Sequence, residues 1–184
     1  MTELCDIAAM YGTDKCPQIK HPFTEFYYEM LKDKRESTRK VVEIGIGMMP
    51  PLYIRGASLY MWRAFFPNAL VYGADIDPSL LFNCDRIKTL YCDQNNRGDL
   101  IRLLESTGTD IDLFVEDGTH LPDDQIFTAR IVVPMLDAST VYVIEDARHY
   151  EVIIDALSEF DCTPIRKRHR SWKDDCLVVV RRKT

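Results

Sequence analysis

Two short acidic runs hold the residue types in this chain that are best suited to chemistry. The first run, residues 116–120, contains Asp117 and His120, and the second run consists of Glu145 and Asp146. Carboxylate oxygens are the ligands that Mg²⁺ prefers, and an imidazole can accept a proton near neutral pH. The two runs together therefore predict a metal site with a base beside it.

Each acidic run follows directly on an apolar, strand-like stretch. These stretches are residues 111–115 and 141–144, and a helix-length segment separates them. Strands connected in this way are parallel and usually close neighbours. Both runs are therefore expected at the same carboxyl edge of one sheet, which is where open α/β sheets bind ligands.

Each run also has a simpler explanation. Aspartate is a favoured N-cap residue, and Asp117 could cap the helix that Pro122 is expected to open. His120 could instead bond a backbone carbonyl of its own loop. The occurrence of both runs at neighbouring strand ends favours the metal site.

Strand-like runs alternate with helix-length segments through the middle of the chain, which predicts a parallel sheet with helices on both faces. The expected strands are residues 41–44, 70–74, 87–91, 111–115 and 141–144, and the expected helices are residues 57–66, 79–83, 97–106, 123–135 and 148–158. Two further strand-like runs, residues 162–169 and 176–182, are joined by a short polar turn and should pair antiparallel. This is the strand inventory of the Rossmann-like class I methyltransferase sheet.

Length and composition predict one globular domain. The 184 residues divide into a helical lead-in, residues 1–39, and a Rossmann-like core, residues 40–184. A net charge of −6 argues against general nucleic-acid binding, which requires a basic surface. The acidic amino terminus and the six cysteines without a CxxC pair favour a cytoplasmic protein, and no apolar run approaches the ~20 residues needed to cross a membrane.

Acidic residues also end the three preceding strands, and these residues are Glu43, Asp75 and Asp93. Gly45 and Gly47 follow the first strand, where a missing Cβ lets the backbone approach a ligand. The Asp75 carboxylate could accept both hydroxyl protons of a ribose, and Asp93 could accept from an adenine amino group. Because Pro50 stands where a dinucleotide motif requires a third glycine, the pattern favours S-adenosylmethionine over a nicotinamide cofactor.

The order of these motifs resembles that of a known group of enzymes. The motifs are Tyr-Gly-Thr-Asp-Lys at residues 11–15, Glu-Ile-Gly-Ile-Gly at 43–47, Tyr-Gly-Ala-Asp-Ile-Asp at 72–77, Cys-Asp-Gln at 92–94, Asp-Gly-Thr-His at 117–120 and Glu-Asp at 145–146. Through them the chain resembles the metal-dependent methyltransferases related to cephalosporin hydroxylase-type proteins and macrolide-sugar O-methyltransferases. The resemblance covers roughly residues 10–147.

The resemblance implies roles for individual residues. It implies Mg²⁺ held by Asp117, Glu145 and Asp146, with His120 as the base. It also implies S-adenosylmethionine bound by the residues at the ends of the first three strands, which are Glu43, Gly45, Gly47, Asp75, Asp93 and Gln94. The macrolide enzymes carry a separate amino-terminal domain, whereas residues 1–39 precede the first strand here, so the acceptor is not carried over.

The expected function is a Mg²⁺-dependent O-methyltransferase acting on a hydroxyl of a small molecule, such as a sugar or a natural product. The alternative is a protein of the same fold that binds S-adenosylmethionine but works as a partner or assembly subunit. A nicotinamide-dependent oxidoreductase is disfavoured by the missing glycine. Homo-oligomer formation stays open.

Four other features carry weaker signals. Residues 11–15 could form a lid over the cofactor or a glycine-containing turn between helices. Packing or surface roles are expected for His21, His149 and His169. The aromatic residues of the segment 23–31 are expected in the core. The basic tail is expected to protect a strand edge rather than to bind a phosphorylated or carboxylated substrate.

Overall fold

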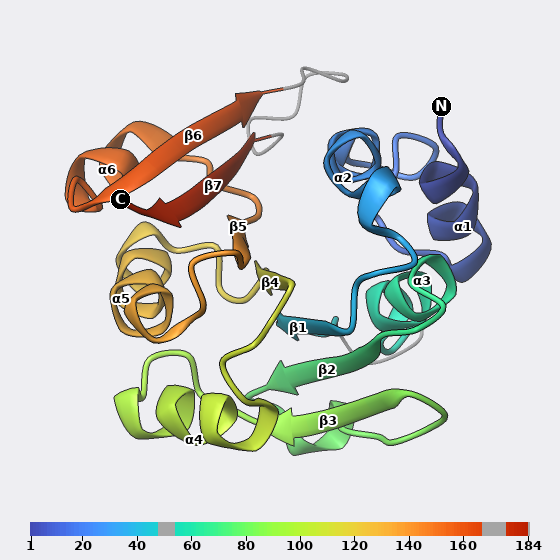
Figure 1. Cartoon of the computed structure of the whole chain (residues 1–184), viewed down its shortest axis with the longest axis horizontal. Helices are drawn as coiled ribbons and strands as arrows, with labels where there is room; N and C mark the ends of the chain where they lie inside the picture. The colour runs from blue at the N-terminus through green and yellow to red at the C-terminus, as the bar shows by residue number, and fades with distance from the viewer. Residues whose placement is uncertain (48–53, 167–175, 184) are drawn as a thin grey trace.

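The strands of the chain form one mixed sheet in the computed structural model, which describes residues 1–47, 54–166 and 176–183 (Figure 1). Within these residues the strand order is β3-β2-β1-β4-β5-β7-β6. The strands are β1 (Lys40–Ile44), β2 (Leu70–Asp75), β3 (Ile87–Tyr91), β4 (Leu113–Glu116), β5 (Val141–Ile144), β6 (Phe160–Arg166) and β7 (Cys176–Arg182). The first five pair in parallel, and β7 pairs antiparallel with β5 and β6. The predicted fold class is therefore confirmed.

Helices cover both faces of this sheet. They are α1 (Glu3–Tyr11), α2 (Phe23–Leu31), α3 (Ala57–Phe65), α4 (Arg97–Thr107), α5 (Pro122–Val132) and α6 (Tyr150–Ala156), with short 3₁₀ turns η1 (Lys32–Lys34), η2 (Pro78–Leu80) and η3 (Val133–Met135). Figure 1 shows α1, α2 and α3 on one side and α4, α5 and α6 on the other. No helix of the described residues is long and apolar enough to cross a membrane.

Two hydrophobic cores result from the alternation of side chains along the strands. Val41, for example, packs with Tyr27 and Trp62 on the face covered by α1 to α3. Its neighbour Val42 packs with Leu100 on the face covered by α4 to α6. Both faces of the sheet are therefore buried, and ligand access is left to the strand ends.

Several predicted elements differ in their bounds by up to three residues, and two of these differences have a local reason. β4 begins at Leu113 because the Asp112 carboxylate accepts bonds from the backbone N–H groups of Arg39 and Lys40, where β1 begins, at 2.7 and 3.0 Å. The expected helix at 79–83 is the shorter turn η2, because the N–H of Phe82 bonds the Thr89 hydroxyl at 2.5 Å. Pro50, His169 and most of the basic tail lie outside the described residues.

The amino-terminal helices lead the chain to the carboxyl edge of the sheet. Thr2 caps α1 through a bond from the N–H of Cys5, and Gly12 ends this helix in the left-handed conformation at φ 73°. The glycine-containing turn expected at residues 11–15 is thus present. Beyond it the chain turns inward, and the Lys15 side chain is only 2% exposed.

Candidate active site at the carboxyl edge of the sheet

A cavity of about 490 Å³ opens where the parallel strands end. Nine of the ten residues predicted from the sequence line it, and these are Gly45, Gly47, Asp75, Asp93, Gln94, Asp117, His120, Glu145 and Asp146. The tenth, Glu43, is fully buried beside the cavity. The segment ahead of the sheet contributes Asp14, Lys20 and His21 to the lining.

The loop that follows β1 packs closely against the backbone of Asp117 after β4 and is bonded to Asp75 at the end of β2. Gly45 has a φ of 85°, and a Cβ at this position would lie 1.9 Å from the carbonyl oxygen of Asp117. The Asp75 carboxylate accepts bonds from the N–H groups of Ile46 at 3.0 Å and Asp77 at 2.9 Å. The loops that follow the two strands are therefore joined through Asp75.

Gln94 orders the loop between β4 and α5. Its amide oxygen accepts a bond from the N–H of Thr119, and its amide nitrogen donates to Glu116, both at 3.0 Å. Asp93 accepts a bond from the N–H of Asn95 at 2.9 Å. Both ends of the Gln94 amide are thus bonded within the protein, and the residue is only 6% exposed.

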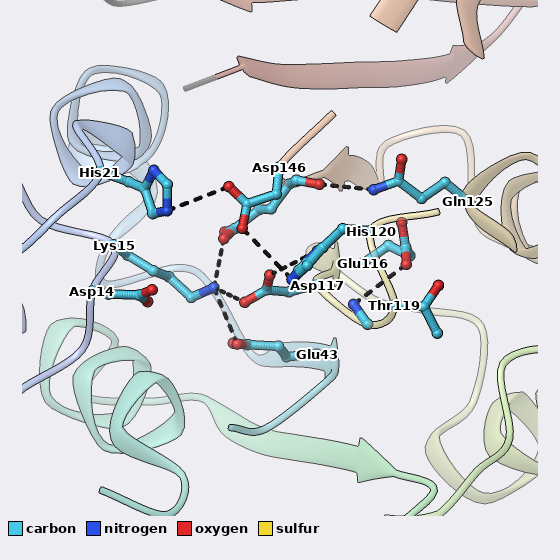
Figure 2. A network of polar contacts seen from close by, with 12 residues as sticks. Asp14, Lys15, His21, Glu43, Glu116, Asp117, Thr119, His120, Gln125 and Asp146 are labelled. Carbon is cyan, nitrogen blue, oxygen red and sulfur yellow. Dashed lines mark hydrogen bonds and ion pairs between the residues drawn. The ribbon is translucent and has the colours of Figure 1, made fainter. Parts of the chain in front are cut away.

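Lys15 lies at the centre of the acidic residues (Figure 2). Its Nζ is 2.5 Å from Asp117 Oδ2, 2.6 Å from Glu145 Oε2 and 3.4 Å from Glu43 Oε1. Burial lowers the pKa of Lys15, but the charges of Asp117, Glu145 and Glu43 outweigh burial and hold this pKa well above its ordinary value. The group is therefore an ammonium ion.

Glu43 and Glu145 are held by aromatic donors as well. The Tyr27 hydroxyl donates to Glu145 Oε1 at 2.6 Å, and the Trp62 indole N–H donates to Glu43 Oε2 at 2.5 Å. Burial raises the pKa of both carboxyl groups, and the charge of Lys15 opposes that rise. Tyr27, expected only as a core residue, thus also bonds a site carboxylate.

Asp117, His120 and Asp146 form the outer part of the cluster, which faces the cavity. One ligand atom from each of the three lies within 4.8 Å of the others. The His120 ring nitrogens are 3.8 Å from Asp117 Oδ1 and 3.7 Å from Asp146 Oδ2. Burial against the cavity wall lowers the pKa of His120, against the opposing charge of Asp117, so the imidazole is neutral near pH 7.

The simpler explanation for Asp117 is wrong. Helix α5 does begin at Pro122, as expected, but its N-cap is Leu121, whose side chain forms no capping bond. Asp117 lies further back and points to Lys15 and His120. The arrangement suits a hard divalent cation, because carboxylate oxygens from two neighbouring strand ends converge there.

Four residues that contact the acidic cluster are absent from the predicted site residues. Lys15 and Tyr27 contact it as described above. His21 is 1% exposed, stacks on Phe23 and places Nε2 3.4 Å from Asp146 Oδ1. Gln125 of α5 donates to the backbone carbonyl of Glu145 at 2.9 Å. The sequence held a signal for two of them, since Lys15 ends the motif at residues 11–15 and His21 follows that motif.

The strand order and the carboxyl-edge cavity are those of the class I methyltransferase fold. Among solved structures, MycE methyltransferase from the mycinamycin biosynthetic pathway, in complex with Mg and SAH, matches with a TM-score of 0.77 and 25% identity, over 99% of this chain and 55% of that chain. CmcI, in a structure described as Mg-SAM, matches with a TM-score of 0.61 and 19% identity, over 88% of this chain and 72% of that chain, which supports the fold alone.

Sequence relatives are O-methyltransferases. The chain is 34% identical over 144 residues to the 8-demethyl-8-(2-methoxy-alpha-L-rhamnosyl)-tetracenomycin-C 3'-O-methyltransferase of Streptomyces olivaceus, covering 78% of this chain and 36% of that protein. It is 33% identical over 144 residues to demethylmacrocin O-methyltransferase of Streptomyces fradiae, with the same coverage. No protein-family model matches. These matches confirm the resemblance predicted from the sequence, although the chain spans about a third of the length of these relatives.

Proposed function

We propose that this chain is the catalytic unit of a Mg²⁺-dependent O-methyltransferase that uses S-adenosylmethionine and acts on a hydroxyl of a small molecule, such as a sugar or natural product. The observation that carries the proposal is the outer cluster of Asp117, His120 and Asp146 on the wall of a 490 Å³ cavity that also contains Asp75 and Asp93. The relatives, which are O-methyltransferases, support the same activity.

Asp117, Glu145 and Asp146 are the residues that would hold Mg²⁺. All three line the cavity and supply oxygen atoms, which suit Mg²⁺ better than zinc. When bound, the cation supplies Lewis acidity that lowers the pKa of a hydroxyl group. The cofactor supplies a methyl group on a sulfonium, which has its own strong driving force for transfer.

The protein has two tasks in this reaction. His120 accepts the hydroxyl proton on a ring nitrogen, because its imidazole is neutral, lines the cavity and has 42% of its side chain exposed. Cavity residues orient the acceptor oxygen toward the methyl group, with the cofactor bound on the side of Gly45, Gly47, Asp75, Asp93 and Gln94. Glu43, predicted to bind the cofactor, is instead buried beside the cavity and bonds Trp62 and Lys15.

Cytoplasmic residence is part of the proposal. All six cysteines, which lie within the described residues, are free thiols. Free thiols persist in reducing compartments, whereas secreted proteins usually pair them.

Isothermal titration calorimetry tests the proposal. We expect heat of binding with S-adenosylmethionine and none with NAD, and we expect Mg²⁺ to bind the wild-type protein. No heat with S-adenosylmethionine would refute the proposal. Binding of S-adenosylmethionine without methyl transfer to any of a panel of glycosylated acceptors would favour the non-catalytic partner instead.

A substitution tests the metal assignment. Asp146→Asn should weaken Mg²⁺ binding and leave the fold intact, because the amide keeps the shape of the side chain but removes its charge. Asp85→Asn is the matched control, since the side chain of Asp85 is 83% exposed outside the cavity. Equal Mg²⁺ affinity in both variants would exclude Asp146 as a ligand.

A further inference from the structure

One ammonium group joins the carboxyl ends of three adjacent strands. Lys15 Nζ donates to Asp117, which follows β4, and to Glu145, which follows β5. It also forms an ion pair with Glu43 of β1. Because β1, β4 and β5 are neighbours in the sheet, the residue that connects their acidic ends comes from outside the sheet, between α1 and α2.

The three carboxylates require a positive charge nearby, because they lie close to one another and are mostly buried. Glu43 and Glu145 are 0% and 1% exposed, and the Asp117 side chain is 19% exposed. Like charges at buried positions repel one another strongly, because the protein interior screens them less than water does. Among the described residues, no arginine and no other lysine forms an ion pair with any of these three.

The two oxygens of Asp117 face different neighbours. Oδ2 accepts the bond from Lys15, whereas Oδ1 points toward His120 at 3.8 Å (Figure 2). The bond to Lys15 therefore determines which oxygen is presented to the cavity. Glu145 is fixed in the same way, by Lys15 on one oxygen and Tyr27 on the other.

We propose that Lys15 is a positioning residue of the metal site, whose ammonium acts as a built-in counter-cation that holds Asp117 and Glu145 together before a divalent cation binds. The inference rests on the proposed function, since it takes these carboxylates as Mg²⁺ ligands. The ligands are therefore already assembled in the metal-free protein. The Lys15 ammonium, however, competes with a bound divalent cation for the same carboxylates.

The test is Lys15→Met, compared with the matched control Lys32→Met. Lys32 pairs with Glu29 on the surface at 2.7 Å, in the same lead-in segment, so the control removes an equivalent charge far from the cluster. Melting temperatures are measured without and with Mg²⁺, and Mg²⁺ alone is titrated into each protein by calorimetry.

For Lys15→Met we expect the melting temperature of the metal-free protein to fall by roughly 10 °C, because a buried ion pair is broken. We expect Mg²⁺ to raise its melting temperature at least about twice as much as that of wild type, and to bind several-fold more tightly, since a competing cation has been removed. Lys15→Arg, which keeps the charge, should respond to Mg²⁺ like wild type, and so should Lys32→Met.

A further variant covers the case in which Lys15→Met does not fold. Lys15→Met combined with Glu43→Gln removes one charge of each sign and should fold. Its response to Mg²⁺ should also exceed that of wild type, because Asp117 and Glu145 still lack their cation.

Two results would overturn the inference, and they are distinguishable. If Mg²⁺ stabilises Lys15→Met and the double variant no more than it stabilises wild type, Lys15 has a structural role alone while the proposed function stands. If Mg²⁺ neither binds nor stabilises wild type, the metal assignment of the proposed function fails and the inference fails with it.

Discussion

At the scale of single residues, His120 has the environment of a general base. Its ring lies between Asp117 and Asp146, and its backbone has a φ of 58°, a conformation that is uncommon for residues other than glycine. Such a backbone persists only where the surroundings determine it, and it directs the ring to the cavity.

His120→Ala should therefore retain S-adenosylmethionine binding and lose turnover by about 10²- to 10⁴-fold, the usual contribution of a positioned base. The measurements are calorimetry with the cofactor and a methyl-transfer assay with an accepted substrate. His149→Ala is the control, because His149 is exposed and does not line the cavity. Equal turnover in the two variants would remove His120 from the mechanism.

Cys92 gives a prediction about pH. Burial raises the pKa of its thiol to about 12, so the reactive thiolate is nearly absent at pH 8. Iodoacetamide should label the exposed Cys84 well before Cys92, and labelling of Cys92 should keep accelerating as pH rises above 9. Peptide mass spectrometry measures both rates, with Cys84→Ser as the control; a Cys92 rate that levels off below pH 9 would contradict the prediction.

At the scale of elements, the turn after β1 determines where β4 can end. The chain after Gly45 passes against the backbone of Asp117, and the N–H of Gly45 bonds the carbonyl of Ala74 at 2.8 Å. Three strand ends are thus in backbone contact at the floor of the cavity. A side chain at residue 45 would push Asp117 away from its partners.

Gly45→Ala should lower the free energy of unfolding by about 3 kcal/mol, through the left-handed φ and the overlap with the Asp117 carbonyl. Gly98→Ala is the control, because its Cβ would meet side-chain atoms and no backbone, namely Arg102 Nη1 and the capping Asn96 Oδ1, each at 3.2 Å. We expect that variant to change stability by less than about 1 kcal/mol. Urea unfolding measures both, and equal stabilities would contradict the close approach.

The strand-end acids are predictable from sequence, because in a parallel sheet the position of a residue along its strand determines the edge where it emerges. The apolar runs that precede them are enough to predict the edge at which Asp117, Glu145 and Asp146 lie. Lys15 could not be placed in this way, since its contacts with Asp117 and Glu145 span 102 and 130 residues. Local patterns do not encode contacts of such length, and an isolated lysine near a glycine is otherwise typical of a solvated turn.

At the scale of the whole molecule, the helices α2 and α3 contact the candidate active site as well as the hydrophobic core. Helix α2 packs its aromatic side chains into the core with α1 and α3, as its spacing predicts. The same helix reaches the site through Tyr27, whose ring meets Trp62 edge-on with centroids 5.0 Å apart. Trp62 in turn donates to Glu43, so α2 and α3 together support two buried carboxylates.

Tyr27→Phe tests this connection with the ring packing preserved. The change removes the donor to Glu145 Oε1, 118 residues away, and leaves that buried oxygen without this partner. An unsatisfied buried acceptor costs about 1–3 kcal/mol of unfolding free energy, more for a charged group. Tyr28→Phe, on the partly exposed side of the same helix, should change the free energy of unfolding by less than about 0.5 kcal/mol.

In Tyr27→Phe the Glu145 carboxylate would be held by Lys15 alone. Mg²⁺ affinity should therefore also change in Tyr27→Phe and not in Tyr28→Phe. Matching urea unfolding curves for the two variants would show that the lead-in helices contribute packing to this site and nothing more.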